Sequence, residues 1–188
     1  GIRLIEIFFD PLIGGIIDNT HTKFGKFKPW LVIGGVVSSL LLIFLFTNFF
    51  GLATHNTTLF IFLFTIVFIL LDSFYSFKDI AFWSMIPALS TETKEREKFA
   101  TFARFGSSLG ANGTTLVVVP IVTFFTYLVT AHHTEGASGW FWFGMITAII
   151  SAGTAIITAL GTKEVNSAIR QQNEKANIKD VFKAIAQN

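Results

Sequence analysis

The sequence predicts an all-α polytopic membrane protein, and its composition, segment lengths and charge distribution all indicate this class. Hydrophobic residues fill 52% of the 188 positions and charged residues 14%, against about 25% charged residues in a soluble domain. Long uncharged runs are able to form helices that cross a bilayer core of about 30 Å. Lys and Arg are concentrated in alternate connections between those runs.

Five apolar segments are expected to form the membrane helices, since each approaches the length of about 20 residues that a span requires. In chain order they are residues 1–17, 31–50, 58–87, 105–131 and 139–162. Pro29 suits the first turn of the second helix. Because the sequence opens without Met inside an apolar segment, we expect it to be a piece of a longer protein.

The distribution of Lys and Arg predicts the orientation. Five alternating spans place the connections 18–29 and 88–98 and the tail 163–188 on one side of the membrane. The connections 51–57 and 132–138 lie on the other side and contain no Lys or Arg. The positive-inside rule therefore makes the basic side cytoplasmic.

The remaining loop and tail residues point to no other class of protein. The run 94–98 is expected to be a solvated loop, and apolar residues at helical spacing within 178–185 predict a short amphipathic helix. With no Cys there is no disulfide framework, and a net charge of +2 is too small to indicate nucleic-acid binding. The four His residues fall in loops without ligand partners: His21, His55, His132 and His133.

Charged residues inside the apolar segments are the candidates for function. A charge at the bilayer centre costs about 2.5–3.5 kcal/mol even on mild insertion scales, so such residues face a partner or a cavity. Arg3, Glu6 and Asp10 fall on one face of the first helix. A second polar stripe occurs in the third segment, at Asp72, Ser76, Asp79 and Trp83.

Counting residues from the cytoplasmic ends brings Asp10, Asp79, Trp83 and Arg104 to similar depths, where they would line one cavity. Two structural alternatives stay open. Arg3 with Glu6, and Arg104 with Asp79, are able to form ion pairs that only hold helices together. Lys78 lies round the helix from Asp79 and is able either to form a salt bridge or to extend toward the interface.

Three stretches of the sequence resemble a known family. "DPLIGGIIDNTHTKFGKFKPW" (10–30) is similar to the segment after the second helix in the glycoside–pentoside–hexuronide:cation symporters, which have the major facilitator fold. "YSFKDIAFWSMIPALSTETKEREKF" (75–99) and "FARFGSSLGAN" (102–112) resemble the next two family blocks. The resemblance is closest to the family's lactose, raffinose and melibiose permeases. It implies helices 2–6 of twelve in residues 1–162 and the start of the central cytoplasmic loop in 163–188.

The resemblance also implies roles for residues of both stripes. Two acidic residues and a hydroxyl would bind the coupling cation: Glu6, Asp10 and Ser76. Four residues would bind the sugar: Asp79, Trp83, Arg104 and Tyr75. Arg3 and Lys78 would be supporting charges. The wider superfamily's cytoplasmic gate motif would comprise Gly14, Asp18, Lys23, Lys26 and Lys28.

Two positions depart from the melibiose permeases and bear on the coupling ion. This chain has Glu6 where those permeases have a shorter Asp, and Phe9 where they have an Asn. A sodium site needs several oxygen ligands, and one is missing here. Two nearby carboxylates in a medium of low dielectric constant titrate as a pair. The resemblance therefore favours H⁺ as the coupling cation, with Na⁺ at Glu6 and Asp10 as the alternative.

The function implied by the resemblance is sugar:cation symport by alternating access, in a multi-pass protein of the bacterial plasma membrane. The expected substrate is a galactoside such as lactose, raffinose or melibiose. The expected partners are the bilayer and the C-terminal half of the same polypeptide. No cofactor, catalytic residue or nucleic acid is expected. A sugar sensor with the same fold and a membrane enzyme using buried carboxylates are the alternatives.

Overall fold

A computed structural model describes residues 2–47, 49 and 52–164, with side chains described in the same ranges except 2–8 and 53. All the regular structure in these ranges is helical. The predicted amphipathic helix within 178–185 lies outside the described residues. The elements in chain order are α1 (Ile2–Asp18), α2 (Lys28–Phe46), α3 (Leu52–His55), α4 (Thr57–Met85), the 3₁₀ helix η2 (Ile86–Ala88), α5 (Thr93–Thr130) and α6 (Ala137–Gly161).

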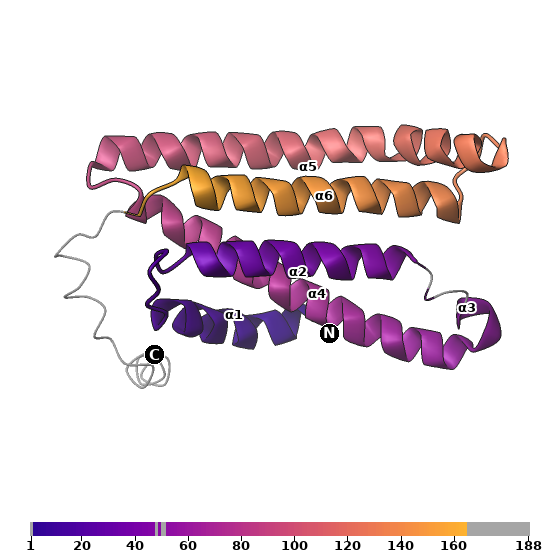
Figure 1. The fold of residues 1–188 in the computed structure, drawn as a ribbon, viewed down its shortest axis with the longest axis horizontal. Coiled ribbons are helices and arrows are strands. Elements are labelled where there is room, and N and C mark those ends of the chain that lie inside the picture. The colour runs from indigo at the N-terminus through magenta and orange to yellow at the C-terminus, as the bar shows by residue number, and fades with distance from the viewer. Residues whose placement is uncertain (1, 48, 50–51, 165–188) are drawn as a thin grey trace.

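The long helices form an elongated bundle in which α5 and α6 run side by side and α4 crosses α2 obliquely (Figure 1). Helix α2 packs against both α4 and α6, α5 packs against α6, and α1 packs against α4. Four stretches are long and apolar enough to cross a bilayer: Lys28–Phe46, Thr57–Ala88, Thr93–Thr130 and Ala137–Gly161. The prediction of an all-α, multi-pass membrane protein is therefore confirmed.

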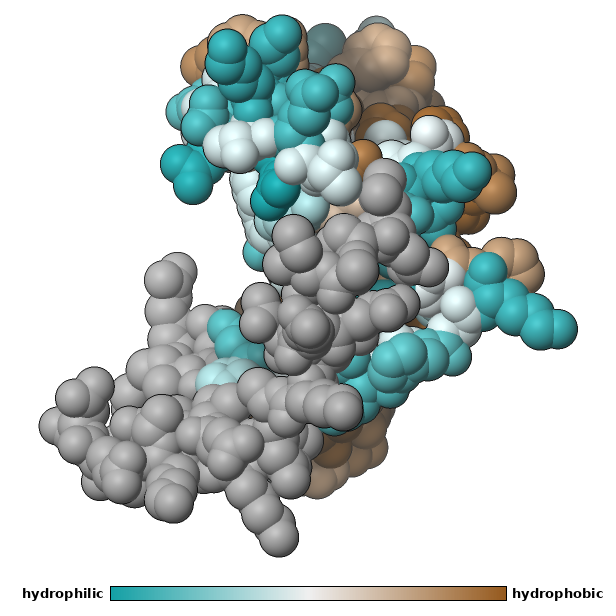
Figure 2. Space-filling model, turned by 90° about the vertical axis from the view of Figure 1, so that its left-hand side faces the viewer, coloured by the Kyte–Doolittle hydropathy of each residue, from teal (hydrophilic) through white to brown (hydrophobic). Residues whose placement is uncertain are grey.

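The expected alternation of the connections is also confirmed. The α1–α2 connection, the α4–α5 connection and residues 162–164 all lie at one end of the bundle (Figure 1). We call this the basic end, because these segments and the adjoining first turns of α2 and α5 hold Lys23, Lys26, Lys28, Lys94, Arg96, Lys98 and Lys163. Figure 2 views this end and shows many hydrophilic side chains among its coloured atoms, with apolar side chains beside and behind them.

The sequence-based boundaries were wrong at two places. The run 94–98, expected to be a loop, forms the first turns of α5, because Lys, Glu and Arg favour helix and Glu95 suits the positive N-terminal end. At 38 residues, α5 is about 57 Å long and so extends well beyond the hydrocarbon core. The second predicted span continued to residue 50, whereas α2 ends at Phe46 and the short helix α3 follows.

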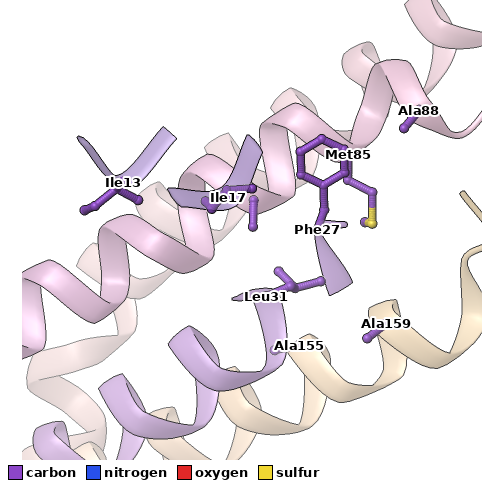
Figure 3. Close-up of a cluster of buried hydrophobic side chains, with 9 residues drawn as sticks. Ile13, Ile17, Phe27, Leu31, Met85, Ala88, Ala155 and Ala159 are labelled. Carbon is purple, nitrogen blue, oxygen red and sulfur yellow. The ribbon is translucent and has the colours of Figure 1, made fainter. Parts of the chain in front are cut away.

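The best-packed core lies at the basic end, where α1, α2, α4 and α6 meet (Figure 3). Its side chains are Ile13, Ile17, Phe27, Leu31, Ala81, Met85, Ala88, Ala155 and Ala159. Trp30 packs beside this core, stacked on Phe77 with the ring centroids 4.9 Å apart. The Trp30 indole N–H also donates to Thr20 Oγ1 at 2.8 Å, which ties the end of α1 to the start of α2.

Helix α2 approaches its neighbours closely because glycines face them. A Cβ atom built on Gly34 would lie 2.7 Å from backbone atoms of Phe74 and Lys78 in α4. One built on Gly35 would lie 2.6 Å from Ala155 Cβ in α6. Since Cβ atoms do not approach other atoms this closely, the observed packing of α2 requires glycine at both positions.

Candidate functional site

The central feature of the candidate site is a hydrogen-bonded pair on α4. Asp79 and Trp83 are separated by one helical turn, so their side chains lie on the same face. The Trp83 indole Nε1–H donates to Asp79 Oδ1 at 3.2 Å, and both side chains are half-buried. A carboxylate accepts hydrogen bonds at about four positions. The bond to Trp83 therefore orients the carboxylate and leaves it capacity to bind other donors.

Helix α1 brings a second carboxylate to this region. α1 packs against α4, and the Asp10 charge is close enough to act electrostatically on Asp79. Asp10 is exposed on the surface of the described residues. Residues 10, 79 and 83, expected together from helix geometry, are thus on adjoining helices.

Pro11 leaves a backbone carbonyl of α1 without its usual helical hydrogen bond. It lies inside α1, and proline has no N–H to donate to the carbonyl of the residue one turn earlier. That residue is Ile7, so position 11 supplies no helical bond to the Ile7 carbonyl. An oxygen without its usual donor therefore lies within a turn of Asp10, where a cation or a water molecule would find an acceptor.

Other predicted members of the cation site are only partly described. Arg3 and Glu6 belong to α1, but their side chains lie outside the described residues. Ser76 and Asp72 lie on α4, within two turns before Asp79, and both are half-buried. In the described part of the chain, no three His, Cys, Asp or Glu side chains converge as a metal site.

Lys78 points away from Asp79 into the junction of α2, α4 and α6. Its Nζ donates to Ser151 Oγ on α6 at 2.9 Å and lies 5.2 Å from the centroid of the Tyr75 ring. Both contacts satisfy an ammonium group that the packing partly removes from solvent. Lys78 forms no ion pair with any described residue, although its charge acts on Asp79.

Arg104 is not brought to this group. It lies on α5, which packs against α6 and η2, and its side chain is exposed. The charges that act on Asp79 among the described residues are those of Lys78 and Asp10. Two residues at a similar depth meet only if their helices are neighbours. Here α5 runs beside α6, whereas α4 crosses the bundle obliquely (Figure 1). The expected grouping of Arg104 with Asp79 is therefore not seen.

The residues of the predicted gate motif lie at the basic end. Lys26 Nζ forms an ion pair with Asp18 Oδ1 at 3.2 Å, which connects the end of α1 to the loop that follows. The Lys28 ammonium donates to the backbone carbonyl of Thr162. Lys23 is exposed, and the Gly14 Cα faces open space.

Sequence reasoning missed Glu164, which binds the start of α2. Its carboxylate accepts from the backbone N–H groups of Lys26 (2.9 Å), Phe27 (3.1 Å) and Lys28 (3.3 Å). One signal was available: α2 starts after a Phe, which has no side-chain acceptor for the helix N-terminus, so an acceptor has to come from elsewhere. The sequence alone did not identify which one.

These features define a class of protein: a polytopic helical membrane protein with carboxylates and a Trp on adjoining helices. All 188 residues match the model of the MFS/sugar transport protein family. The chain belongs to this family, which is one of transport proteins.

Several sugar permeases and transporters are similar to this chain in sequence. The chain is 50% identical over 188 residues to the lactose permease of Leuconostoc lactis, matching 100% of this chain and 29% of the permease. It is 45% identical over 188 residues to the raffinose carrier protein of Pediococcus pentosaceus, with coverage of 100% and 29%. It is 29% identical to the isoprimeverose transporter of Lactiplantibacillus pentosus, with coverage of 99% and 37%. The chain thus spans about a third of the length of these bacterial relatives.

Proposed function

We propose that the full protein containing this chain is a galactoside:cation symporter, and that this chain supplies its coupling carboxylates and part of its sugar site. The observation that carries the proposal is the Asp79–Trp83 pair on α4, adjoined by Asp10 on α1. The names of the similar lactose permeases and raffinose carrier support a galactoside substrate.

The α4 pair suits recognition of a sugar ring. A carboxylate accepts hydrogen bonds from two adjacent hydroxyl groups, and bonds to a charged acceptor are stronger than neutral ones. The Trp83 indole offers a flat apolar surface on which the less polar face of a galactosyl ring would stack. Tyr75, which lies about one turn before Asp79 on α4 and is 49% exposed, would extend this surface. Arg104 would donate to the sugar from α5, independently of Asp79.

The α1 carboxylates suit coupling to a cation. Because the Asp10 charge acts on Asp79, neutralising Asp10 changes the electrostatic environment in which the sugar is bound. The effect is reciprocal: sugar bound at Asp79 alters the affinity of the cation at Asp10 and Glu6 to the same degree. The two halves of the polypeptide would then rock around the shared site.

We infer that the coupling cation is H⁺. The pair of Glu6 and Asp10 needs no further ligand to exchange a proton, whereas Na⁺ requires several oxygens. Phe9, which is 47% exposed beside Asp10, provides none. Sodium would have to use Ser76 and the Ile7 carbonyl in addition to the carboxylates, which makes Na⁺ the alternative.

The test is the external pH of lightly buffered, de-energised cells that make the full-length protein. Adding lactose, raffinose or melibiose should make the medium alkaline, and the response should not require Na⁺. The D10N variant is the matched control and should give no alkalinisation. Sugar uptake that needs Na⁺ and moves no protons would replace H⁺ by Na⁺, whereas sugar binding without any flux would show a sensor in place of a transporter.

A further inference from the structure

Glu164 binds the N-terminus of α2 from a distant part of the chain. Three consecutive N–H groups, those of residues 26–28, donate to its two carboxylate oxygens at 2.9–3.3 Å. The N–H groups of the first residues of a helix have no acceptors inside the helix, and the N-terminal end of the helix carries a partial positive charge. A carboxylate accepts hydrogen bonds from these N–H groups, and its negative charge is favourable at the positive end. Asp or Ser just before the helix normally supplies the acceptor, but here the N-cap residue is Phe27, which makes no side-chain cap.

A positively charged side chain of α2 lies at the C-terminal end of α6. The Lys28 ammonium donates to the carbonyl of Thr162, immediately after α6 ends at Gly161. A cation is favourable at a helix C-terminus, where carbonyl groups lack partners. The two helix ends therefore exchange opposite charges: the carboxylate that follows α6 caps α2, and the ammonium in the first turn of α2 caps α6.

The loop before α2 is shaped around this carboxylate. Gly25 has φ +110°, a conformation that side chains disfavour. A Cβ atom at this position would also lie 2.5–2.9 Å from the Glu164 carboxylate. Glycine is thus needed at position 25 both for the backbone conformation and for the close approach of Glu164.

The same loop is connected to α1 and to the core. Lys26, whose N–H Glu164 binds, pairs through its side chain with Asp18 at the end of α1. Phe27, also bound by Glu164, is buried in the same core cluster as Ile13 and Ile17 of α1 (Figure 3). Contacts therefore run without a break from Glu164 to the half of α1 that follows Asp10.

We propose that Glu164 is a positioning residue that latches the α1–α2 connection to the end of α6 and so holds α1 in the orientation that coupling requires. The latch consists of the Glu164 carboxylate on residues 26–28 together with the Lys28 ammonium on Thr162. It fixes the chain after α6 to the helix bundle through residue 164. The effect on coupling rests on the proposed symport function, while the latch itself does not.

The latch is tested by hydrogen exchange in the full-length protein, resolved to single amides. In E164A, the amides of Lys26, Phe27 and Lys28 should exchange at least about tenfold faster, because they lose a charged acceptor. In E164Q, which keeps one oxygen, the acceleration should be smaller. The control is E97A, which removes an exposed carboxylate at the same end of the bundle. Unchanged exchange at residues 26–28 in folded E164A would overturn the latch.

The positioning role is tested by sugar uptake in the same variants at equal amounts of protein in the membrane. Glu164 does not belong to the sugar site, so E164A should lower the maximal rate of uphill uptake several-fold and leave the KM for sugar within about twofold. E164Q should fall between E164A and the wild type, and E97A should match the wild type. Faster amide exchange with an unchanged maximal rate would overturn the positioning role and leave a latch without effect on transport.

Discussion

At the scale of single residues, spacing within one helix predicts contacts well and contacts between helices poorly. The bond between Asp79 and Trp83 follows from the four-residue separation that puts side chains on one face. The bond from Lys78 to Ser151 joins positions 73 residues apart and depends on how α2, α4 and α6 pack. Helical periodicity carries no information on how helices pack, so the sequence alone leaves both possibilities for Lys78 open.

Trp83 should contribute to sugar affinity in two separable ways. Replacing it with Ala removes both the stacking surface and the donor to Asp79, and the KM for sugar should rise at least about tenfold, equivalent to about 1.4 kcal/mol. Replacing it with Phe keeps a ring and removes the donor, so the increase should be smaller. Initial rates of galactoside uptake by the full-length protein measure both. Equal KM values in wild type and W83A would remove Trp83 from the sugar site.

Asp10 should be required for coupling and dispensable for binding. In D10N the cation-dependent charge change near Asp79 is lost, so uphill accumulation of sugar should disappear. Binding of a labelled galactoside to purified protein and downhill flux should persist at reduced levels. The contradicting result is accumulation by D10N at the wild-type ratio, which would assign coupling to other groups.

At the scale of helices, the sequence predicted which segments are helical better than it predicted where they end. Apolar runs indicate which residues lie in the bilayer, whereas helix ends depend on residues outside it, some near in sequence and some distant. Helix α5 begins at Thr93, before its apolar part, because Lys, Glu and Arg in the run 94–98 favour helix in water. The start of α2 is stabilised by Glu164, which no local rule around Lys28 would identify.

The contact of α2 with α4 should be intolerant of even one added carbon. Gly34→Ala places a Cβ 2.7 Å from the backbone of α4, so the helices have to separate, at a cost of about 1–3 kcal/mol. Gly153→Ala on α6 is the matched control, because no atom of the described residues lies within 4 Å of its Cβ position. Thermal unfolding of the purified full-length protein should show a lower midpoint for G34A than for G153A. The same midpoint in both would contradict the close approach.

At the scale of the whole molecule, the alternation of basic and uncharged connections was predictable because it is imposed by the bilayer and not by side-chain packing. Helices that cross in turn put every second connection on the same side, and the structure gathers residues 19–27, 89–92 and 162–164 at one end. The place of Arg104 was not predictable in this way. Its distance from Asp79 depends on which helices are neighbours, and α5 has α6 as its main neighbour.

The orientation of the bundle gives a prediction that concerns all helices at once. If the positive-inside rule applies, the basic end faces the cytoplasm and the connection 131–136 faces the exterior. The chain has no Cys, so a single Cys introduced into a full-length protein cleared of other Cys gives a specific label. F24C replaces a side chain that is 80% exposed at the basic end, and H133C replaces an exposed residue at the other end.

A membrane-impermeant maleimide should label H133C in intact cells and F24C only in inside-out vesicles. Labelling of both variants after detergent treatment shows that each thiol is reactive when reached. If F24C were labelled in intact cells, the basic end would face outward, and Asp10 would then lie toward the external mouth of the site. Because alternating access opens the same site to each side in turn, this result would reject the predicted topology and leave the symport mechanism to the D10N measurements.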